Sequence, residues 1–377
     1  MRRLTAALAC VTALAGCGSS SDKKAAPSST PAAASSAPAF IGVTSGDLTN
    51  PGVRVASELT LMGRSGVGSV RAPFYWREAQ PSRGGPTSFK VTDPLVEAAA
   101  RAHVGVLPVV IGTPAWAARH PGKANSPPQG SATYAAFLRA LVGRYGPHGS
   151  FWTEHPGVPR MSIRDWQIWN EPNHAFYWSD QPFTRDYIAL LRAARTAIHA
   201  ADPGGRAVLS GFAERSWELI AGLYRAGARG AFDVAAIHPY TFEVPNVLKI
   251  ARLVRAAMVR GGDAHLPMMI TEFGWSSGKG KVRHPFGFET TPADQAARLR
   301  SLVPLFARNR RALGLERIYW ESWMSADRNA SAPFDFAGLR ELVAGGTSRA
   351  KPAYDAFRTV ATGIGRCLRT TPSAPCG

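Results

Sequence analysis

The stretch Ile163-Arg164-Asp165-Trp166-Gln167-Ile168-Trp169-Asn170-Glu171-Pro172-Asn173 decides how this chain is interpreted. It begins with β-branched and aromatic residues and contains no Gly or Pro before position 172, a pattern that predicts a strand. It ends in the polar pair Asn170 and Glu171, after which Pro172 cannot continue a ladder. A buried strand with a carboxylate at its C-terminal end is typical of parallel α/β barrels, which present catalytic groups in this way.

A second stretch, Met268-Met269-Ile270-Thr271-Glu272-Phe273-Gly274-Trp275, repeats this design about a hundred residues later. Glu171 and Glu272 both lie among apolar and aromatic residues, which raise the pKa of a carboxyl group and can keep one of a pair protonated near neutral pH. Cleavage of a glycosidic bond needs an acid for the leaving oxygen and a second carboxylate near the anomeric carbon. The two residues therefore predict a glycosidase site, although either one alone could be an ion-pair partner.

The rest of the chain alternates short apolar runs with helical patterns, as expected of βα units. We predict strands at 40–43, 67–71, 104–111, 206–212, 232–238 and 317–323 besides the two stretches above, and helices at 53–63, 93–102, 131–145, 184–201, 217–225, 247–260, 291–309 and 352–362. This order predicts a single (β/α)8 TIM barrel over residues 40–377 with no second domain. Because the region exceeds the ~250 residues of a typical barrel, we expect enlarged loops at the C-terminal face.

The two strand ends resemble those of clan A retaining glycoside hydrolases. Trp169-Asn170-Glu171-Pro172-Asn173 is most similar to family 39 and its relatives, and family 5 cellulase-like enzymes come next. The resemblance covers about residues 40–362 and implies a barrel with the acid/base on strand four and the nucleophile on strand seven. Glu171 would then be the general acid/base, Glu272 the nucleophile, and Asn170 the ligand of the sugar 2-hydroxyl.

The same resemblance implies further site residues. His238 and Tyr240 match a His-x-Tyr that follows strand six, in which the Tyr contacts the nucleophile. Arg71, at the end of the predicted second strand, matches an Arg that supports the nucleophile, although it could be a surface Arg. The clan places an aromatic platform under the sugar on strand eight, where Trp320 and Trp323 are the candidates. Trp323 is favoured because it lies nearer the loop.

Trp116 and Trp275 lie in predicted mouth loops and could line outer sugar subsites, although packing within the loops is an equal alternative.

Other chemistries find little support in the sequence. The sequence contains no Gly-x-Ser-x-Gly, Cys-x-x-Cys or His-Glu-x-x-His motif and no Gly-rich phosphate loop after a strand. We therefore expect no metal site and no organic cofactor.

The N-terminal region predicts export. Residues 1–16 combine Arg2 and Arg3 with an apolar run, which is typical of a signal peptide. Leu14-Ala15-Gly16-Cys17 resembles a bacterial lipobox, which implies cleavage before Cys17 and a lipid on that residue; an ordinary signal peptide with an incidental Cys17 is the alternative. Residues 17–39 have no large apolar side chain and predict a disordered tether. We expect a lipoprotein of the bacterial cell membrane that faces outside the cytoplasm.

Two cysteines remain, Cys367 and Cys376. Export permits oxidation, so we expect a C-terminal disulfide, with two free thiols as the alternative.

The formal charge of +18, or +16 once Arg2 and Arg3 are removed, is spread singly along apparent helices. This pattern favours a solvated surface and not a nucleic-acid site. The expected partner is a carbohydrate, and we expect a monomer. A non-catalytic barrel that holds an anionic glycan through its charge is the alternative function, although a binder has no need for two such carboxylates.

Overall fold

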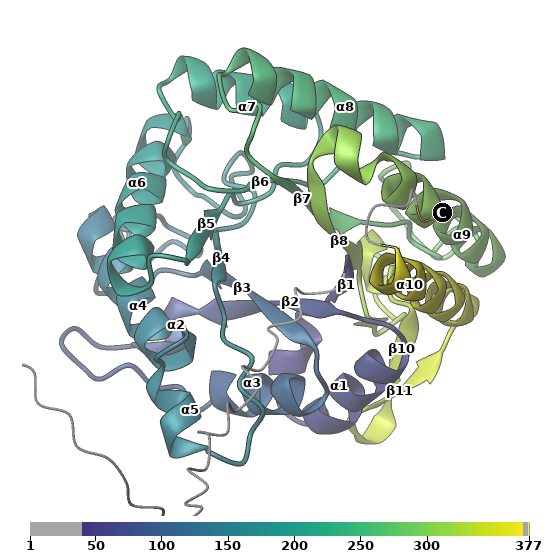
Figure 1. Cartoon of the computed structure of the whole chain (residues 1–377), viewed down its shortest axis with the longest axis horizontal. Helices are drawn as coiled ribbons and strands as arrows, with labels where there is room; N and C mark the ends of the chain where they lie inside the picture. The colour runs from purple at the N-terminus through teal and green to yellow at the C-terminus, as the bar shows by residue number, and fades with distance from the viewer. Residues whose placement is uncertain (1–39, 372–375, 377) are drawn as a thin grey trace, which may run out of the picture. The chain divides into compact units, whose positions relative to one another are not determined.

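The structure, a computed structural model, describes residues 40–371 and residue 376. Its main sheet has eight parallel strands in the order β5-β4-β3-β2-β1-β8-β7-β6. A parallel bridge between Val208 and Val234 joins the two outer strands, so the sheet closes into a (β/α)8 barrel (Figure 1). The predicted fold class is confirmed. The strands are β1 (Ile41–Thr44), β2 (Ser69–Tyr75), β3 (Gly105–Ile111), β4 (Asp165–Ile168), β5 (Arg206–Val208), β6 (Ala235–Ile237), β7 (Met268–Phe273) and β8 (Leu315–Glu321).

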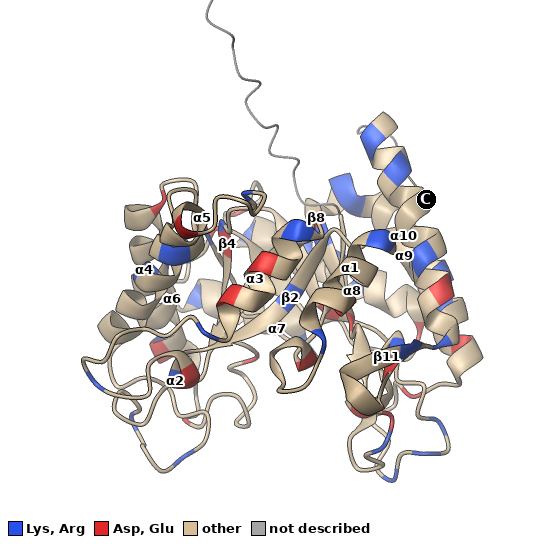
Figure 2. Ribbon diagram, turned by 90° about the horizontal axis from the view of Figure 1, so that it is seen from below, with Lys and Arg blue, Asp and Glu red and all other residues tan. Residues whose placement is uncertain are grey.

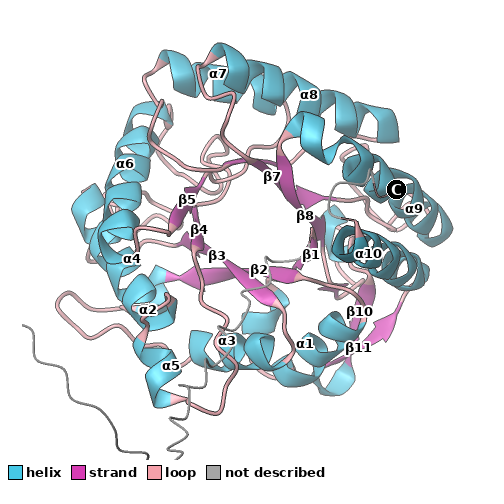
Figure 3. Cartoon of the chain, viewed as in Figure 1, coloured by secondary structure: helices cyan, strands magenta, loops and turns pink. Residues whose placement is uncertain are grey.

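Helices surround the barrel, as the cyan ring around the magenta strands shows (Figure 3). One long helix follows each of the eight barrel strands. Two short helices, α2 (Trp76–Ala79) and α5 (Ser150–Glu154), are additions to this pattern. The long helices are α1 (Val55–Arg64), α3 (Thr92–Arg101), α4 (Ser131–Tyr145), α6 (Thr184–Ala201), α7 (Ser216–Arg225), α8 (Val244–Arg260), α9 (Pro292–Leu313) and α10 (Pro352–Thr370).

The principal differences from the predicted elements concern the second strand and the last loop. β2 continues to Tyr75, so Arg71 lies within the strand and not at its end. The segment 324–349, predicted as an enlarged loop, instead carries three strands that form a small separate sheet: β9 (Met324–Ser325), β10 (Arg340–Val343) and β11 (Thr347–Ala350). Enlarged loops extend from the side of the barrel where α2 and β11 lie (Figure 2). Because both elements follow the ends of barrel strands, this side is the C-terminal face.

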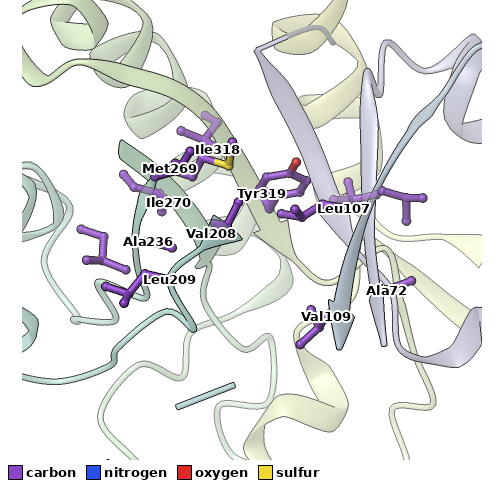
Figure 4. Packing of buried hydrophobic residues seen from close by; sticks show 14 of the residues in the cluster. Ala72, Leu107, Val109, Val208, Leu209, Ala236, Met269, Ile270, Ile318 and Tyr319 are labelled. Atoms are coloured by element: carbon purple, nitrogen blue, oxygen red, sulfur yellow. The ribbon is translucent and has the colours of Figure 1, made fainter. Parts of the chain in front are cut away.

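The apolar core lies mainly between the sheet and the helices. Strand side chains that face the helices are aliphatic or aromatic and fully buried, such as Ile270 and Ile318 (Figure 4). Ile270 is opposite Ile318 in the register of β7 and β8. Burial of this apolar surface stabilises the barrel because it removes the side chains from water.

The barrel interior is polar at its N-terminal end. Asp165 of β4 accepts hydrogen bonds from Nε of Arg206 at 2.7 Å and from the guanidinium of the buried Arg317 on β8. Burial alone would raise the pKa of Asp165, but the charges of Arg317 and Arg206 outweigh burial and lower it. Buried ion pairs of this kind hold their partners strongly, because losing one partner leaves the other charge without compensation.

Substitution of Asp165 by Asn is expected to destabilise the protein by about 3–5 kcal/mol at pH 7, because Arg317 keeps its buried charge without an anionic partner. The depressed pKa of Asp165 means that its contribution is complete above its unfolded-state pKa and is lost as pH falls through the folded-state pKa, below 3.8. Urea unfolding at pH 7 and at lower pH measures both effects. Asp355→Asn, in an exposed pair with Arg358, is the control, and equal effects of the two substitutions would contradict the prediction.

At the end of the chain, α10 carries Cys367, which forms a disulfide with Cys376; their Cα atoms are 5.7 Å apart. The predicted signal peptide, lipidated Cys17 and tether lie outside the described residues. Within the described part of the chain, no helix is both long and apolar enough to cross a membrane.

Candidate active site

Glu272 reaches the barrel interior because β7 carries an extra residue. Ile270 is opposite Ile318 and Phe273 is opposite Trp320, so two residues of β7 face a single residue of β8 between these pairs. Such a β-bulge changes the direction of side chains and is common beside active sites. Here it allows both Thr271 and Glu272 to make contacts inside the barrel.

Arg71 connects the two halves of the site. Its guanidinium donates from Nη1 to Oε1 of Glu272 at 2.7 Å and from Nη2 to Oδ1 of Asn170 at 2.6 Å. Its Nε donates to Oε1 of Gln167 at 2.6 Å, which fixes the orientation of the guanidinium plane. The side chain of Arg71 is only 4% exposed, so it is not a surface residue. A planar, permanently charged group suits this role because it directs several donors at fixed angles.

Glu171 lies just beyond β4 on a strained turn. Trp169 and Glu171 have positive φ values of 69° and 36°, conformations that cost energy in residues with a Cβ. Packing holds the turn in place: the indole nitrogen of Trp169 donates to the carbonyl of Tyr177 at 2.7 Å, and its ring packs edge-on against Trp178. The turn brings the buried Glu171 carboxylate to the mouth of the barrel, opposite β7.

His238 follows β6 (Ala235–Ile237) and is completely buried against Glu171. Its Nδ1 is 2.6 Å from Oε1 of Glu171, and its Nε2 is 2.9 Å from Oγ1 of Thr271. Gln167 donates its amide N–H to Oγ1 of Thr271 at 3.2 Å, which leaves the Thr271 hydroxyl hydrogen free for Nε2. In this arrangement the neutral ring carries its proton on Nδ1 and donates it to Glu171.

The space occupied by His238 depends on Gly211. Gly211 has a φ of +79°, and a Cβ there would be 2.1 Å from Nε2 of His238. Both the conformation and the close approach require glycine.

Tyr240 stabilises the ionised form of Glu272. Its hydroxyl donates to Oε2 of Glu272 at 2.8 Å, while Arg71 donates to Oε1. Burial alone would raise the pKa of Glu272, but the neighbouring imidazole of His238, the charge of Arg71 and the hydrogen bonds from Tyr240 and Arg71 outweigh burial and lower the pKa. A carboxylate held in this way is anionic at neutral pH, which a nucleophile requires.

Glu171, His238 and Glu272 form a compact group in which one donor atom from each lies within 4.8 Å of the other two. Such a group could in principle hold a metal ion. Its atoms already have hydrogen-bond partners, since Nδ1 of His238 pairs with Glu171 and Oε2 of Glu272 accepts from Tyr240. The short distance between the two carboxylates matches retaining glycosidases, whose carboxyl groups are ~5–5.5 Å apart, and not inverting ones.

The expectation of a tryptophan platform on strand eight is wrong for both candidates. Trp320 and Trp323 are 0% exposed and offer no face to a sugar. Trp320 faces the helices, where its ring contacts Phe273 and Trp275. Trp323 follows the strand, and its indole nitrogen donates to Glu58 of α1 at 2.8 Å. Residues that alternate with Trp320 along β8 face the interior instead.

The two loop tryptophans differ from each other. Trp275 is 1% exposed, and its indole nitrogen donates to the carbonyls of Thr241 and Phe242, so it packs the loop and does not line a subsite. Trp116 is half-buried, donates to the carbonyl of Gln80 at 2.9 Å and keeps part of its ring at the surface.

The sequence did not point to several residues of this site. Gln167 and Thr271 lie inside predicted strands as isolated polar residues, and that polarity was the available signal. Burial and the nearby charge of Glu272 raise the pKa of Glu321, the last residue of β8. A cluster of aromatic rings, which we name the mouth aromatic cluster, extends outward from Tyr240 through loop residues. Its members are Tyr240, Phe334, Phe288 and Phe286.

Solved structures similar to this chain include glycoside hydrolases. A family 39 glycoside hydrolase from Bacteroides cellulosilyticus matches with a TM-score of 0.64 and 18% identity over 87% of this chain and 64% of that chain. The chain has the barrel fold of these enzymes. A family 5 glycoside hydrolase from Bifidobacterium longum matches with a TM-score of 0.62 and 17% identity over 89% of this chain and 79% of that chain. A monomeric β-xylosidase from Caulobacter crescentus matches with a TM-score of 0.60 and 17% identity over 85% of this chain and 67% of that chain.

Sequence comparison gives a shorter match. A β-xylosidase from Geobacillus stearothermophilus is 26% identical over 149 residues, which cover 34% of this chain and 29% of that protein. The chain thus matches less than a third of this relative. No family model matches the sequence.

Proposed function

We propose that this protein is a retaining glycoside hydrolase that cleaves O-glycosidic bonds of an oligo- or polysaccharide by double displacement. The supporting observation is the pair Glu171 and Glu272, whose carboxylate oxygens approach within 4.8 Å while their environments differ. Glu272 is held as an anion by Arg71 and Tyr240, whereas Glu171 is paired with a histidine. Two nearby carboxyl groups with different environments are what an acid/base and a nucleophile require.

In the first step, Oε2 or Oε1 of Glu272 attacks the anomeric carbon while Glu171 gives its proton to the glycosidic oxygen. The bond from the anomeric carbon to the aglycone breaks, the aglycone leaves as an alcohol, and a glycosyl ester forms on Glu272. Asn170 is fixed by Arg71 beside the nucleophile, in a position suited to the sugar 2-hydroxyl. A hydrogen bond there strengthens as positive charge develops on the sugar ring.

In the second step, Glu171 acts as a base. It takes a proton from water, whose oxygen attacks the anomeric carbon, and Glu272 leaves as a carboxylate. His238 donates its Nδ1–H to Oε1 of Glu171 and so keeps the carboxyl group in one orientation in both steps.

The mouth aromatic cluster supports a sugar substrate. The ring of Phe334 is 5.2 Å from that of Tyr240, and Phe288 is 4.9 Å from Phe334. Phe334 and Phe286 are 38% and 68% exposed, so their faces are open to a ligand. Aromatic rings bury apolar area efficiently and bind the C–H faces of sugars. The cluster begins at a residue that contacts the nucleophile, so a bound chain could extend from the site along it.

The proposed function is tested by screening aryl glycosides and polysaccharides, followed by reaction with the 2-deoxy-2-fluoro glycoside of the best sugar. The fluorine slows both steps, and a good leaving group such as dinitrophenolate restores the first, so the glycosyl ester is expected to accumulate. Mass spectrometry of peptides should place the added sugar on Glu272. Labelling elsewhere, or turnover with inverted anomeric configuration, would sink the proposal.

We also propose that residues 40–377 form the catalytic domain of an exported, membrane-anchored lipoprotein that acts as a monomer. The sequence of residues 1–39 supports this through its signal-peptide pattern and the lipobox-like Cys17. Cys17→Ser is expected to move the protein from the membrane fraction to the soluble fraction, and an unchanged distribution counts against the anchor.

A further inference from the structure

Glu321 faces the barrel interior at the position where an aromatic platform was expected. On β8 the side chains alternate: Trp320 packs on the helix side, whereas the hydroxyl of Tyr319 is 2.7 Å from that of Ser69 inside the barrel. Two residues beyond Tyr319, Glu321 points to the same side. It is opposite Thr44 in the register of β1 and β8.

The surroundings of Glu321 belong to the catalytic site. In its ionised form Glu321 acts electrostatically on Tyr240 and Tyr177, the same two tyrosines on which Glu171 and Glu272 act. Burial and then the charge of Glu272 raise the pKa of Glu321 well above that of an ordinary carboxyl group, although Arg71 and a hydrogen bond from Thr44 oppose this. A second anion so close to Glu272 is unfavourable, which favours the protonated form of Glu321.

One oxygen of Glu321 has no partner. Oε2 is buried, and no hydrogen bond from the described residues reaches it. A buried polar atom without a partner is destabilising, so native proteins rarely leave one without a reason. Oε2 of Glu321 lies among the groups that surround the proposed nucleophile. This position indicates that the partner of the atom is a ligand of the site.

We propose that Glu321 binds the sugar in the catalytic site as a neutral carboxylic acid, through a hydrogen bond between Oε2 and a hydroxyl group of the glycone. This inference rests on the proposed function. A hydroxyl group can donate and accept, so it pairs with a protonated carboxyl group without creating charge. An ammonium group of an amino sugar can only donate, and its charge would favour the ionised form of Glu321 beside Glu272. The site is therefore selective for a glycone with a hydroxyl group at this position.

Substitution by glutamine distinguishes a neutral Glu321 from an ionised one. Glutamine resembles the neutral acid in shape and donates a hydrogen bond through its amide. Glu321→Gln is expected to keep kcat/KM within about threefold of the parent on the best aryl glycoside, whereas Glu321→Ala lowers it about 10-fold to 100-fold. Glu321→Trp places an aromatic group at this position and is expected to lower kcat/KM as much as Glu321→Ala does. Glu316→Gln, an exposed residue of the same strand paired with Arg206, is the matched control and should not change kcat/KM.

A set of monodeoxy glycosides then identifies the hydroxyl group. In the parent, removal of one hydroxyl should lower kcat/KM about 10-fold or more, and in Glu321→Ala the same removal should have little further effect. Melting temperatures confirm that each variant is folded. The inference is overturned if no hydroxyl shows this coupling, if Gln is as harmful as Ala, or if the parent prefers an amino sugar.

Calorimetric binding of the free monosaccharides separates this inference from the proposed function. If the parent binds a sugar but cleaves none, the proposed function fails, and the same comparison of Gln, Ala and deoxy sugars on binding decides the role of Glu321. If the parent cleaves a glycoside without any coupling at Glu321, only this inference fails. If the parent neither binds nor cleaves any sugar, both are wrong.

Discussion

Glu272→Ala is expected to lower kcat by about 10⁴-fold to 10⁶-fold on the best aryl glycoside, because no bond to the anomeric carbon can form without the nucleophile. KM should change little, since Arg71, Asn170 and the aromatic rings remain. Steady-state kinetics of the parent and the variant measure this. In the parent, the acid limb of kcat/KM should lie below pH 4.5, because the lowered pKa keeps Glu272 ionised above that value and activity is lost as pH falls through it.

Addition of azide is a positive control for the role of Glu272. In Glu272→Ala a small anion can occupy the space of the missing carboxylate and attack the anomeric carbon from the same side. The product should be a glycosyl azide with inverted configuration. Glu218→Ala, which removes an exposed carboxyl group on α7, is the matched control and should behave as the parent. Undiminished hydrolysis by Glu272→Ala would exclude this residue as the nucleophile.

Glu171→Ala is expected to lower kcat/KM by about 10²-fold to 10⁴-fold for glycosides whose leaving alcohol must be protonated. The loss should nearly disappear with a dinitrophenyl glycoside, because dinitrophenolate leaves without a proton. The dependence of kcat/KM on the pKa of the leaving group should therefore be much steeper in the variant than in the parent. Rates for a series of substituted phenyl glycosides give this slope.

The same series tests the assignment of roles between the two carboxyl groups. Removal of a nucleophile slows every leaving group, whereas removal of an acid slows only poor ones. If Glu171→Ala lost the same factor with all phenols, Glu171 would not be the proton donor. The pattern distinguishes the two residues even when both variants are nearly inactive on natural glycosides.

The fold could be predicted from the sequence because each strand and helix of a parallel barrel has its own periodicity. Continuous apolar runs such as 104–111 announce strands buried on both faces. Glu171 and Glu272 could be found because each interrupts such a run near its end. Their pairing followed from the count of strands and not from any contact visible in the sequence.

The orientation of side chains at the strand ends could not be predicted in the same way. Trp323 seemed suited to the mouth because it lies near a loop, but it is buried against α1 and α10. Arg71 was placed at a strand end, although the strand continues to Tyr75. Glu321 lies between Trp320 and Trp323 in the sequence, and the prediction for this strand considered only the two tryptophans. Local patterns specify that a strand exists, whereas tertiary packing decides where it stops and which residues turn inward.

The extra residue in β7 makes the reactive group of this barrel depend on a count of residues. Because side chains alternate along a strand, loss of one position between Ile270 and Phe273 would leave a single inward-facing residue where two now meet the interior. If Thr271 were deleted, Glu272 would still face the interior, but the hydroxyl group that contacts His238 would be lost. If Glu272 were deleted, Thr271 would be the residue that faces the interior. Transfer of this strand to another barrel must therefore preserve the number of its residues as well as their identity.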